Sequence, residues 1–319
     1  MKKLFILSLI ILQSLTIKGE TNLTGPGSYK ILSENKQPIK IPFKMADGKP
    51  ALDCIINGKP AKLMIDNGIL WDEVWLFGSP LVDELNLKPE VTGQIGGAGE
   101  GDPTEAYISE PISLKFDDII FYEQPVIISP SAVGFTDMFP KVDGQLCNTF
   151  FKHFLVEFDF IDNYVILHKP EDFKFDKNGC VLEMNETPSE THSVPFSFTM
   201  LDGKKYDGQV DIDFGGIYPF KIALNNELNI QLPDDVEPIN NVFGAQGKIS
   251  QWKGQIKSMT FGKYLYKNPT VMYGNRESSR IHPENLGVLG LPLFMDFDIT
   301  FDYINGKLYL LPNKNYTER

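Results

Sequence analysis

The chain contains one unusual segment twice, as Lys62-Leu63-Met64-Ile65-Asp66-Asn67-Gly68-Ile69 and as Val210-Asp211-Ile212-Asp213-Phe214-Gly215-Gly216-Ile217. In each copy an apolar, strand-like run leads to an Asp, one further residue and a Gly. A carboxylate at the end of an apolar strand is unfavourable unless another group meets it. We therefore expect Asp66 and Asp213 to face each other, although either one alone could be an ordinary turn residue at a strand end.

The repeat extends well beyond these two segments. In both halves the same features follow in the same order: the Asp segment, a stretch of small residues (Gly96–Gly101 or Phe243–Lys248) and a closing block (Asp143–Phe160 or Leu286–Tyr303). The interval from Asp66 to Ala98 equals the interval from Asp213 to Ala245. Two copies of so long a unit predict a protein with two similar lobes rather than a solenoid.

The composition is that of an acidic globular protein. Hydrophobic residues make up 42% of the 319 positions, charged residues make up 23%, and the formal net charge is −12. A chain of this length can bury two cores of ordinary size. Its negative field would repel nucleic acids and anionic membranes, so we expect neither as a partner.

The first residues have the pattern of an export signal. Lys2 and Lys3 precede an apolar run, Leu4–Ile17, that is shorter than the ~20 residues of a membrane span. We expect a mature protein in the periplasm or the extracellular space, without stable membrane insertion. The predicted divisions are a signal peptide at 1–19, a polar lead-in at 20–40, an N-terminal lobe at 41–175, a linker at 176–192 and a C-terminal lobe at 193–313.

The secondary structure is expected to be mostly β. Short runs rich in Val, Ile, Phe and Tyr alternate with turn dipeptides. Asn57-Gly58 predicts a tight hairpin whose second strand delivers the first Asp, and Asp202-Gly203 has the matching place before the second. Helix signals are few: residues 79–85 predict a brief helix, and Ala223–Leu228 is its expected counterpart.

The chain resembles the pepsin- and retropepsin-type aspartic proteases, particularly bacterial secreted proteins with two retropepsin-like lobes in one chain. The resemblance extends from about Ile41 to the C-terminus and rests on an ordered set of motifs. These are the Asn-Gly-Lys hairpin, the Asp-x-Gly loop, the helix motif Val82-Asp83-Glu84-Leu85-Asn86-Leu87, the glycine-rich flap and Val288-Leu289-Gly290 in the second closing block. The resemblance implies an all-β, bilobal acid-protease fold, double-ψ β-barrel-like, with two homologous lobes and few short helices.

In that family two neighbouring carboxylates share one proton. The ionised one activates a water molecule, and the protonated one donates to the carbonyl oxygen of the peptide bond. The residues that the resemblance assigns are the catalytic Asp66 and Asp213, the loop glycines Gly68 and Gly215, and the flap residues Gly97, Ala98, Gly244 and Ala245. The flaps would close over an extended peptide or protein substrate. No metal and no cofactor are implied, and two lobes in one chain favour a monomer.

Two positions depart from the family pattern. The family has Thr or Ser after each catalytic Asp, and that hydroxyl hydrogen-bonds to the opposite lobe; here the positions hold Asn67 and Phe214. Asn can donate and accept, but Phe can do neither, so the cross-lobe lock is predicted to be at least half missing. Retention of both Asp residues favours an aspartic endopeptidase. The altered loops favour an inactive relative that binds a peptide, glycan or partner protein in the same cleft, and a structural surface protein with a vestigial cleft is a third alternative.

Other catalytic chemistries have little support. The four His residues lack zinc spacing, and we expect them on the surface or in loops. We expect three thiols, with Cys54 and Cys147 in the core, rather than a Cys147–Cys180 disulfide. Asp211 shares the strand face of Asp213, and we expect it to be solvated or to face the linker rather than to be catalytic.

Overall fold

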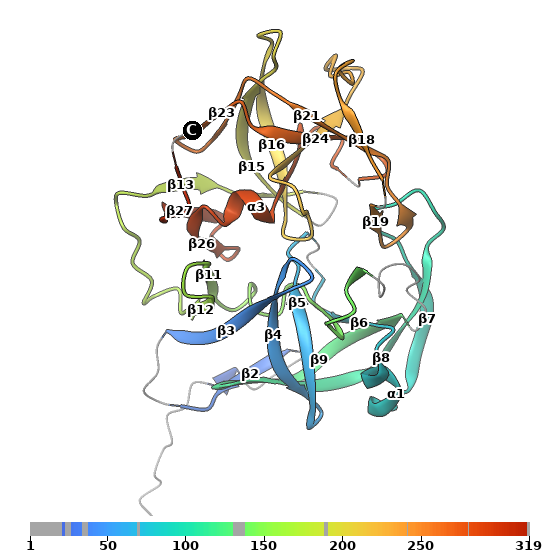
Figure 1. Ribbon diagram of the computed structural model, residues 1–319. Helices are drawn as coiled ribbons and strands as arrows, with labels where there is room; N and C mark the ends of the chain where they lie inside the picture. Colours follow the sequence, from blue (N-terminus) through green and yellow to red (C-terminus); the bar gives the residue numbers. More distant parts are fainter. Residues whose placement is uncertain are drawn as a thin grey trace, which may run out of the picture.

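The computed structural model describes residues 21–22, 27–33, 38–68, 71–129, 138–187, 191–240, 242–279 and 281–317. The predicted signal peptide, residues 1–19, lies outside the described residues. Two β lobes lie one above the other in Figure 1, and strands from both of them pair at one side. The expected all-β class is confirmed, and the helices within the described ranges are few and short.

The first lobe is built around the strand that leads to Asp66. Its strands are β1 (Thr21–Asn22), β2 (Ser28–Ile31), β4 (Lys49–Ile56), β5 (Lys59–Ile65), β6 (Val74–Phe77), β7 (Pro89–Ile95), β8 (Thr104–Phe116), β9 (Ile119–Ser129) and β10 (Gly144–Leu146). β4 and β5 form the predicted hairpin. Asn57 and Gly58 both take positive φ, at 47° and 83°, as the favoured two-residue hairpin turn requires. β1 and β2, from the predicted lead-in, extend this sheet along β9.

The second lobe repeats the arrangement. Its strands are β14 (Asn185–Glu186), β15 (His192–Thr199), β16 (Lys205–Asp213), β17 (Phe220–Leu224), β18 (Glu237–Ile239), β19 (Phe243–Gly244), β20 (Gly247–Lys248), β21 (Gln251–Gln255), β22 (Ser258–Phe261), β23 (Tyr264–Lys267), β24 (Thr270–Asn275) and β25 (Gly287–Gly290). The strand order β4-β5-β10-β6-β9 in the first lobe corresponds to β15-β16-β25-β17-β24 here. In both lobes the strand before the Asp pairs in parallel with the closing-block strand, β10 or β25. The sequence repeat is therefore a repeat of topology.

A third group of strands joins the lobes. These are β3 (Ile39–Ala46), β11 (Leu155–Asp159), β12 (Tyr164–His168), β13 (Cys180–Glu183), β26 (Phe297–Asp302) and β27 (Lys307–Pro312), in the order β3-β12-β11-β26-β27-β13. The two lobes meet where β11 pairs with β26. β13 comes from the predicted linker and lies at the edge of this sheet. The alternating pattern of β3 turns Ile39, Ile41 and Phe43 into the core, which anchors the sheet to the first lobe.

One of the two expected helices is present. α1 (Pro80–Leu85) lies in the first lobe, where the Ser79 hydroxyl oxygen accepts a hydrogen bond from the Leu81 N–H at the helix start. Pro80 occupies the first turn, where its missing N–H costs nothing. A second helix, α3 (Leu291–Phe294), follows β25.

The helix expected at Ala223–Leu228 is wrong. The chain there is the end of β17 followed by a turn. The side chain of Asn225 closes this turn, because its Oδ1 accepts hydrogen bonds from the N–H groups of Glu227 and Leu228. Asn225 also bridges to Ile230, so its side-chain turn replaces the helix that was expected as the counterpart of α1.

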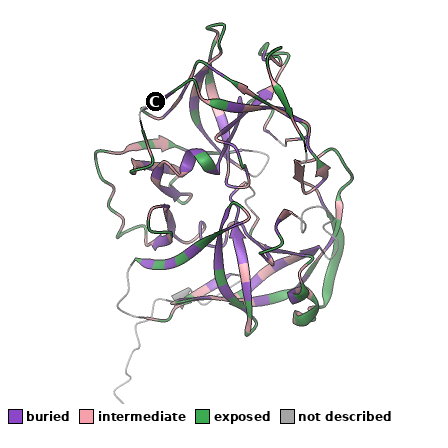
Figure 2. Cartoon of the chain, in the orientation of Figure 1, coloured by how far each residue is buried: buried purple, intermediate pink, exposed green. Residues whose placement is uncertain are grey.

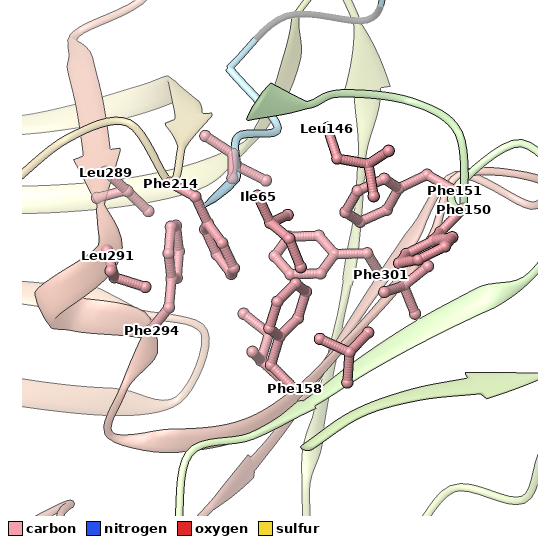
Figure 3. Packing of buried hydrophobic residues seen from close by; sticks show 14 of the residues in the cluster. Ile65, Leu146, Phe150, Phe151, Phe158, Phe214, Leu289, Leu291, Phe294 and Phe301 are labelled. Carbon is pink, nitrogen blue, oxygen red and sulfur yellow. The ribbon is translucent and has the colours of Figure 1, made fainter. Parts of the chain in front are cut away.

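One hydrophobic core continues from lobe to lobe. Its centre holds Phe158 from β11, Phe301 from β26 and the side chain of Phe214 (Figure 3). The ring centroid of Phe214 lies 4.6 Å from that of Phe158 and 5.4 Å from that of Phe301. Figure 2 shows a long exposed stretch on β7, in which only Ile95 is buried. The second Asp loop is therefore anchored in packing that both lobes share.

Candidate active site

The ends of β5 and β16 bring Asp66 and Asp213 together. A side chain on Gly215 would begin 2.5 Å from Oδ1 of Asp213 and 2.9 Å from Oδ2 of Asp66. A side chain on Gly68 would begin 2.6 Å from Oδ1 of Asp213. Both carboxyl groups therefore border the same small space, and they interact through a side-chain hydrogen bond. Only glycine fits at these two loop positions without displacing a carboxylate.

The Asp66 carboxyl group binds protons far more tightly than an ordinary Asp. Burial is the largest cause, and the neighbouring charge of Asp213 adds to it, so that the pKa of Asp66 rises to about 7. The Gly68 N–H, which donates to Asp66 Oδ1 at 2.9 Å, and the charge of Lys49 oppose this rise. A hydrogen-bonded pair of this kind holds one proton between its two carboxyl groups up to near-neutral pH.

The cross-lobe lock is present in a different chemical form. Asn67 Oδ1 accepts a hydrogen bond of 2.9 Å from the backbone N–H of Phe214 on the opposite lobe. Lys49, at the start of β4 in the first lobe, donates to the carbonyl oxygens of Phe214 (2.7 Å) and Gly215 (2.5 Å). The prediction that the lock is at least half missing is therefore wrong, because a lysine that the motif comparison did not consider supplies the second connection.

Lys49 is almost completely buried, with 1% of its surface exposed. Burial lowers the pKa of its ammonium, while the charges of Asp213 and Asp66 raise it. A buried cation beside two carboxylates offsets part of their repulsion. The sequence offered little signal for this role, since Lys49 follows Asp47-Gly48 and resembles an ordinary hairpin residue.

Phe214 does not separate the two carboxylates. Its side chain is fully buried and packs into the core shared by the lobes (Figure 3). Only its backbone N–H and C=O groups take part in the cross-lobe contacts. The phenyl ring therefore anchors the loop by packing in the shared core, whereas a hydroxyl side chain would anchor it by a hydrogen bond to the opposite lobe.

Two loops cover the paired carboxylates, as the glycine-rich stretches predicted. The first connects β7 to β8, and the second is the hairpin of β19 and β20; the two lie side by side in Figure 1. The Gln246 N–H donates to the Ala98 carbonyl oxygen at 2.9 Å, and the Gly101 N–H donates to the Gln246 carbonyl oxygen at 2.6 Å. We call these two loops, residues 96–101 and 243–248, the flaps.

The side chain of Gln246 strengthens the contact between the flaps. Its Oε1 accepts from the Gly97 N–H at 2.9 Å, and its Nε2 donates to the Gly101 carbonyl oxygen at 3.0 Å. A side chain on Gly97 would begin 2.6 Å from the Ala245 Cβ, and one on Gly244 would begin 2.2 Å from the Ala98 carbonyl oxygen. All four predicted flap residues therefore belong to one close contact between the lobes, in which Gln246 is the central residue.

A cavity of about 1010 Å³ lies between the flaps and the paired carboxylates. Its size is at the upper end of the ~300–1,000 Å³ typical of ligand pockets. Asp66, Asp213 and the flap residues Gly97, Ala98, Gly244 and Ala245 all border it. The predicted residues therefore line one cavity between the two lobes.

Asp211 is not solvated; of the two roles expected for it, the structure shows the contact with the predicted linker, through Thr191. Only 2% of its surface is exposed, and it borders the same cavity. Its carboxylate accepts hydrogen bonds from the Thr191 hydroxyl (3.3 Å), the His282 N–H (3.1 Å) and Asn285 Nδ2 (2.6 Å). Burial raises its pKa, and these three donors oppose that rise. Its hydrogen bonds hold the 282–285 loop against the wall of the cavity.

His192 is likewise buried rather than at the surface. Its ring stacks on Tyr303 with a centroid distance of 3.8 Å, and burial lowers its pKa to about 4. Cys54 and Cys147 are buried as predicted, and neither they nor Cys180 forms a disulfide. Among the described residues there is no group of three or more His, Cys, Asp or Glu placed to hold a metal ion. Nor does the described part of the chain contain a helix with the length and apolarity that crossing a bilayer requires.

Comparison with solved structures identifies the fold as that of pepsin-like aspartic proteinases. An aspartic proteinase from Irpex lacteus superposes with a TM-score of 0.56 at 12% identity, over 86% of this chain and 97% of its own. Basic 7S globulin from soybean is similar at a TM-score of 0.47 and 11% identity, over 85% of this chain and 94% of its own. No model of a known protein family and no curated protein sequence matches the chain. The bilobal acid-protease fold that the resemblance implied is confirmed.

Proposed function

We propose that the chain is an aspartic endopeptidase that uses Asp66 and Asp213 as its catalytic pair. The observation that carries the proposal is the hydrogen-bonded pair of carboxyl groups below a cavity of peptide-binding size. The cross-lobe hydrogen bonds of Asn67 and Lys49 support it, because they hold both loops in fixed relation.

The proposed reaction needs only water and the two carboxyl groups. The ionised carboxylate takes a proton from a water molecule, and the resulting hydroxide attacks the carbonyl carbon of the scissile peptide bond. The protonated carboxyl donates its proton to the carbonyl oxygen, which stabilises the tetrahedral intermediate. The carboxyl that took the proton from water then gives it to the peptide nitrogen, while the other carboxylate takes a proton from a hydroxyl of the intermediate. The C–N bond breaks to give a new carboxyl end and a new amino end, and the pair again holds one proton.

The flaps give the proposed enzyme two covers, one from each lobe, as in the retropepsin-like pattern. An extended peptide in the cavity would lie between them and the catalytic pair. Closure over the peptide excludes water from the reacting bond. We propose that the protein acts as a monomer after export, with its signal peptide removed, on peptides or unfolded proteins in the periplasm or outside the cell.

Cleavage of a denatured protein substrate by the full chain, with Asp66→Asn and Asp213→Asn as matched variants, tests the proposal. We expect cleavage in the acidic to near-neutral range, inhibition by a statine-type transition-state mimic, and no cleavage by either variant. Cleavage that survives Asp213→Asn would contradict the assignment of the pair. Tight binding of a peptide that is never cleaved, unchanged by either substitution, would favour the binding protein that the altered loops suggested.

A further inference from the structure

The pseudo-symmetry of the two lobes gives the cavity two matching walls. In the first lobe, β5, β10 and β6 place Met64, Gln145 and Trp75 side by side in one row. In the second lobe, β16, β25 and β17 place Asp211, Val288 and Lys221 in the corresponding row. All six residues border the cavity. The backbone is therefore repeated while the chemistry of the two rows differs.

The first-lobe wall is apolar and aromatic. Met64 and Trp75 belong to a buried hydrophobic cluster that also includes Phe139, and Trp71 packs against this cluster. The indole Nε1 of Trp75 already donates to the Ser129 hydroxyl at 3.0 Å. This wall therefore offers a bulky apolar surface, suited to a large apolar side chain.

The second-lobe wall has a cation where the first lobe has Trp75. Lys221 has 4% of its surface exposed. Among the described residues its ammonium donates to Ser279 Oγ at a long 3.4 Å, and it lies 4.5 Å from the ring centre of Tyr218. An ammonium group has three donor hydrogens, so this buried cation is poorly satisfied by its surroundings.

The neighbouring charges do not satisfy Lys221. Asp211, in the same row, already accepts three hydrogen bonds from Thr191, His282 and Asn285. A second cation, Arg276, borders the same side of the cavity, and its buried Nη2 has no partner within the described ranges. This half of the cavity therefore presents positive groups with unused donors, although Asp213 and Glu277 also border it and the protein as a whole has a net charge of −12.

We infer that Lys221 selects a substrate residue with an acidic side chain in the second-lobe half of the cleft, next to Asp213, opposite a large apolar residue in the first-lobe half. This inference rests on the proposed peptide-binding cleft and names the class of peptide that the cleft accepts. A Glu or Asp carboxylate supplies the acceptor that the ammonium lacks. Burial lowers the pKa of Lys221 to about 8, and Asp213 opposes this fall, so Lys221 is charged at neutral and acidic pH.

Peptides that differ at one position test the inference. The peptides are short, N-acetylated and C-amidated, and contain Phe next to a varied residue that is Glu, Gln, Leu or Lys; one series has Phe before the varied residue and the other has it after. The only carboxylate offered is then that of the Glu side chain. In one of the two series we expect kcat/KM of the wild-type chain to be roughly 10- to 100-fold higher for the Glu peptide than for the Gln peptide. A charge-assisted hydrogen bond in a desolvated site has an effect of this size.

Variants of Lys221 separate recognition from the catalytic chemistry. Lys221→Met keeps the length of the side chain and should abolish the Glu-over-Gln ratio, whereas Lys221→Glu should shift the preference to the Lys peptide. Lys253→Met removes an exposed lysine from β21 and should leave the ratio unchanged. Equal cleavage of the Glu and Gln peptides by the wild-type chain, or a Glu preference that persists in Lys221→Met, would overturn the inference without affecting the proposed activity.

Binding decides the inference even if no peptide is cleaved. Asp66→Asn retains the Asp213 charge beside Lys221, and calorimetric titration of this variant with the same peptides measures recognition alone. We expect tighter binding of the Glu peptide than of the Gln peptide, and loss of that difference in the double variant with Lys221→Met. Equal affinities in Asp66→Asn would overturn the inference. A Lys221-dependent difference without cleavage by the wild-type chain would support the inference and reject proteolysis.

Discussion

The ammonium of Lys49 lies 2.7 Å from the carbonyl oxygen of Phe214, although the two residues belong to opposite lobes. Phe214 occupies a position at which the aspartic-protease pattern has a hydroxyl side chain. The N–H of Phe214 donates to the side-chain oxygen of Asn67. Two side chains of the first lobe therefore hydrogen-bond to the N–H and the C=O of one residue of the second lobe. The same cation stabilises the ionised form of Asp66. Lys49 therefore joins the positioning of the second loop to the electrostatics of the pair.

Replacing Lys49 by Met should reduce the proposed activity by roughly 100-fold, since displacements near 1 Å at a catalytic pair have effects of this size. The folded state should also lose stability, because the carbonyl oxygens of Phe214 and Gly215 lose their donor, at a cost of about 1–3 kcal/mol for each buried acceptor left unpaired. Without the charge of Lys49 the pKa of Asp66 rises further, so the pH profile of kcat should move to higher pH. Peptide cleavage across the pH range and urea unfolding measure these effects.

Lys44→Met is the matched control for this variant, because Lys44 lies on the exposed face of the neighbouring strand β3. It should change neither the rate nor the pH profile. A Lys49→Met chain that cleaves peptides as fast as the wild type, with the same profile, would show that the contact between Lys49 and Phe214 has no part in the chemistry.

Phe214→Thr, which restores a hydroxyl residue of the family pattern, should destabilise the protein rather than activate it. The ring of Phe214 is fully buried among Phe158, Phe294 and Phe301. Truncation of such a ring costs about 3–5 kcal/mol of unfolding free energy, which urea unfolding measures. Phe173→Thr, at a half-buried position outside this cluster, should cost much less. A gain of activity in Phe214→Thr without loss of stability would contradict the view that the ring anchors the loop.

The sequence predicted those site residues whose positions depend on nearby residues in the chain. Asp66, Asp213 and the flap glycines each follow a strand or turn signal, and each has a counterpart one repeat away. The topology and the meeting of the two Asp loops followed from that repetition. Asn225 shows the limit of that comparison, because its side-chain turn follows β17 where the repeat suggested a second helix.

Residues that act across the lobes could not be predicted in this way. Lys49 and Lys221 reach the cavity only because β4 and β17 lie beside the loops, and nothing in their own neighbourhoods signals burial. Gln246 lies within a predicted flap, but its role depends on hydrogen bonds to the other flap. The pattern of one repeat does not specify contacts between repeats.

Gln246→Ala should loosen the closed flaps. The variant loses the side-chain hydrogen bonds to Gly97 and Gly101, each of which contributes about 1 kcal/mol. The population of open flaps should rise, and kcat/KM for peptides should fall by roughly 10-fold because closure positions the substrate. Hydrogen exchange followed by mass spectrometry should show faster exchange across residues 96–101 and 243–248.

Gln255→Ala removes a single amide hydrogen bond from β21, away from the flaps, and serves as the control. It should leave exchange in both flaps at the wild-type rate. If Gln246→Ala also exchanges at the wild-type rate, the backbone hydrogen bonds between the flaps are sufficient to hold them closed.

Asp66 should make the folded protein less stable as the pH rises. Burial and the charge of Asp213 raise its pKa from 3.8 to about 7 in the folded state. Below the lower value both the folded and the unfolded chain hold the proton, so Asp66 imposes no penalty. Between the two values the unfolded chain releases a proton that the folded chain keeps, and stability falls with each step in pH. Above about 7 that loss is complete.

Asp66→Asn has no group to titrate at this position, so its stability should decline less than that of the wild type between about pH 4 and pH 7. The free energy of urea unfolding, followed by tryptophan fluorescence at several pH values, measures the difference. Asp53→Asn is the control. The hydrogen bond from Lys62 lowers the pKa of this exposed carboxyl group, so its removal should change the pH dependence of stability in the opposite direction. Parallel pH dependences for the wild type and Asp66→Asn would mean that Asp66 is not the group that retains the shared proton.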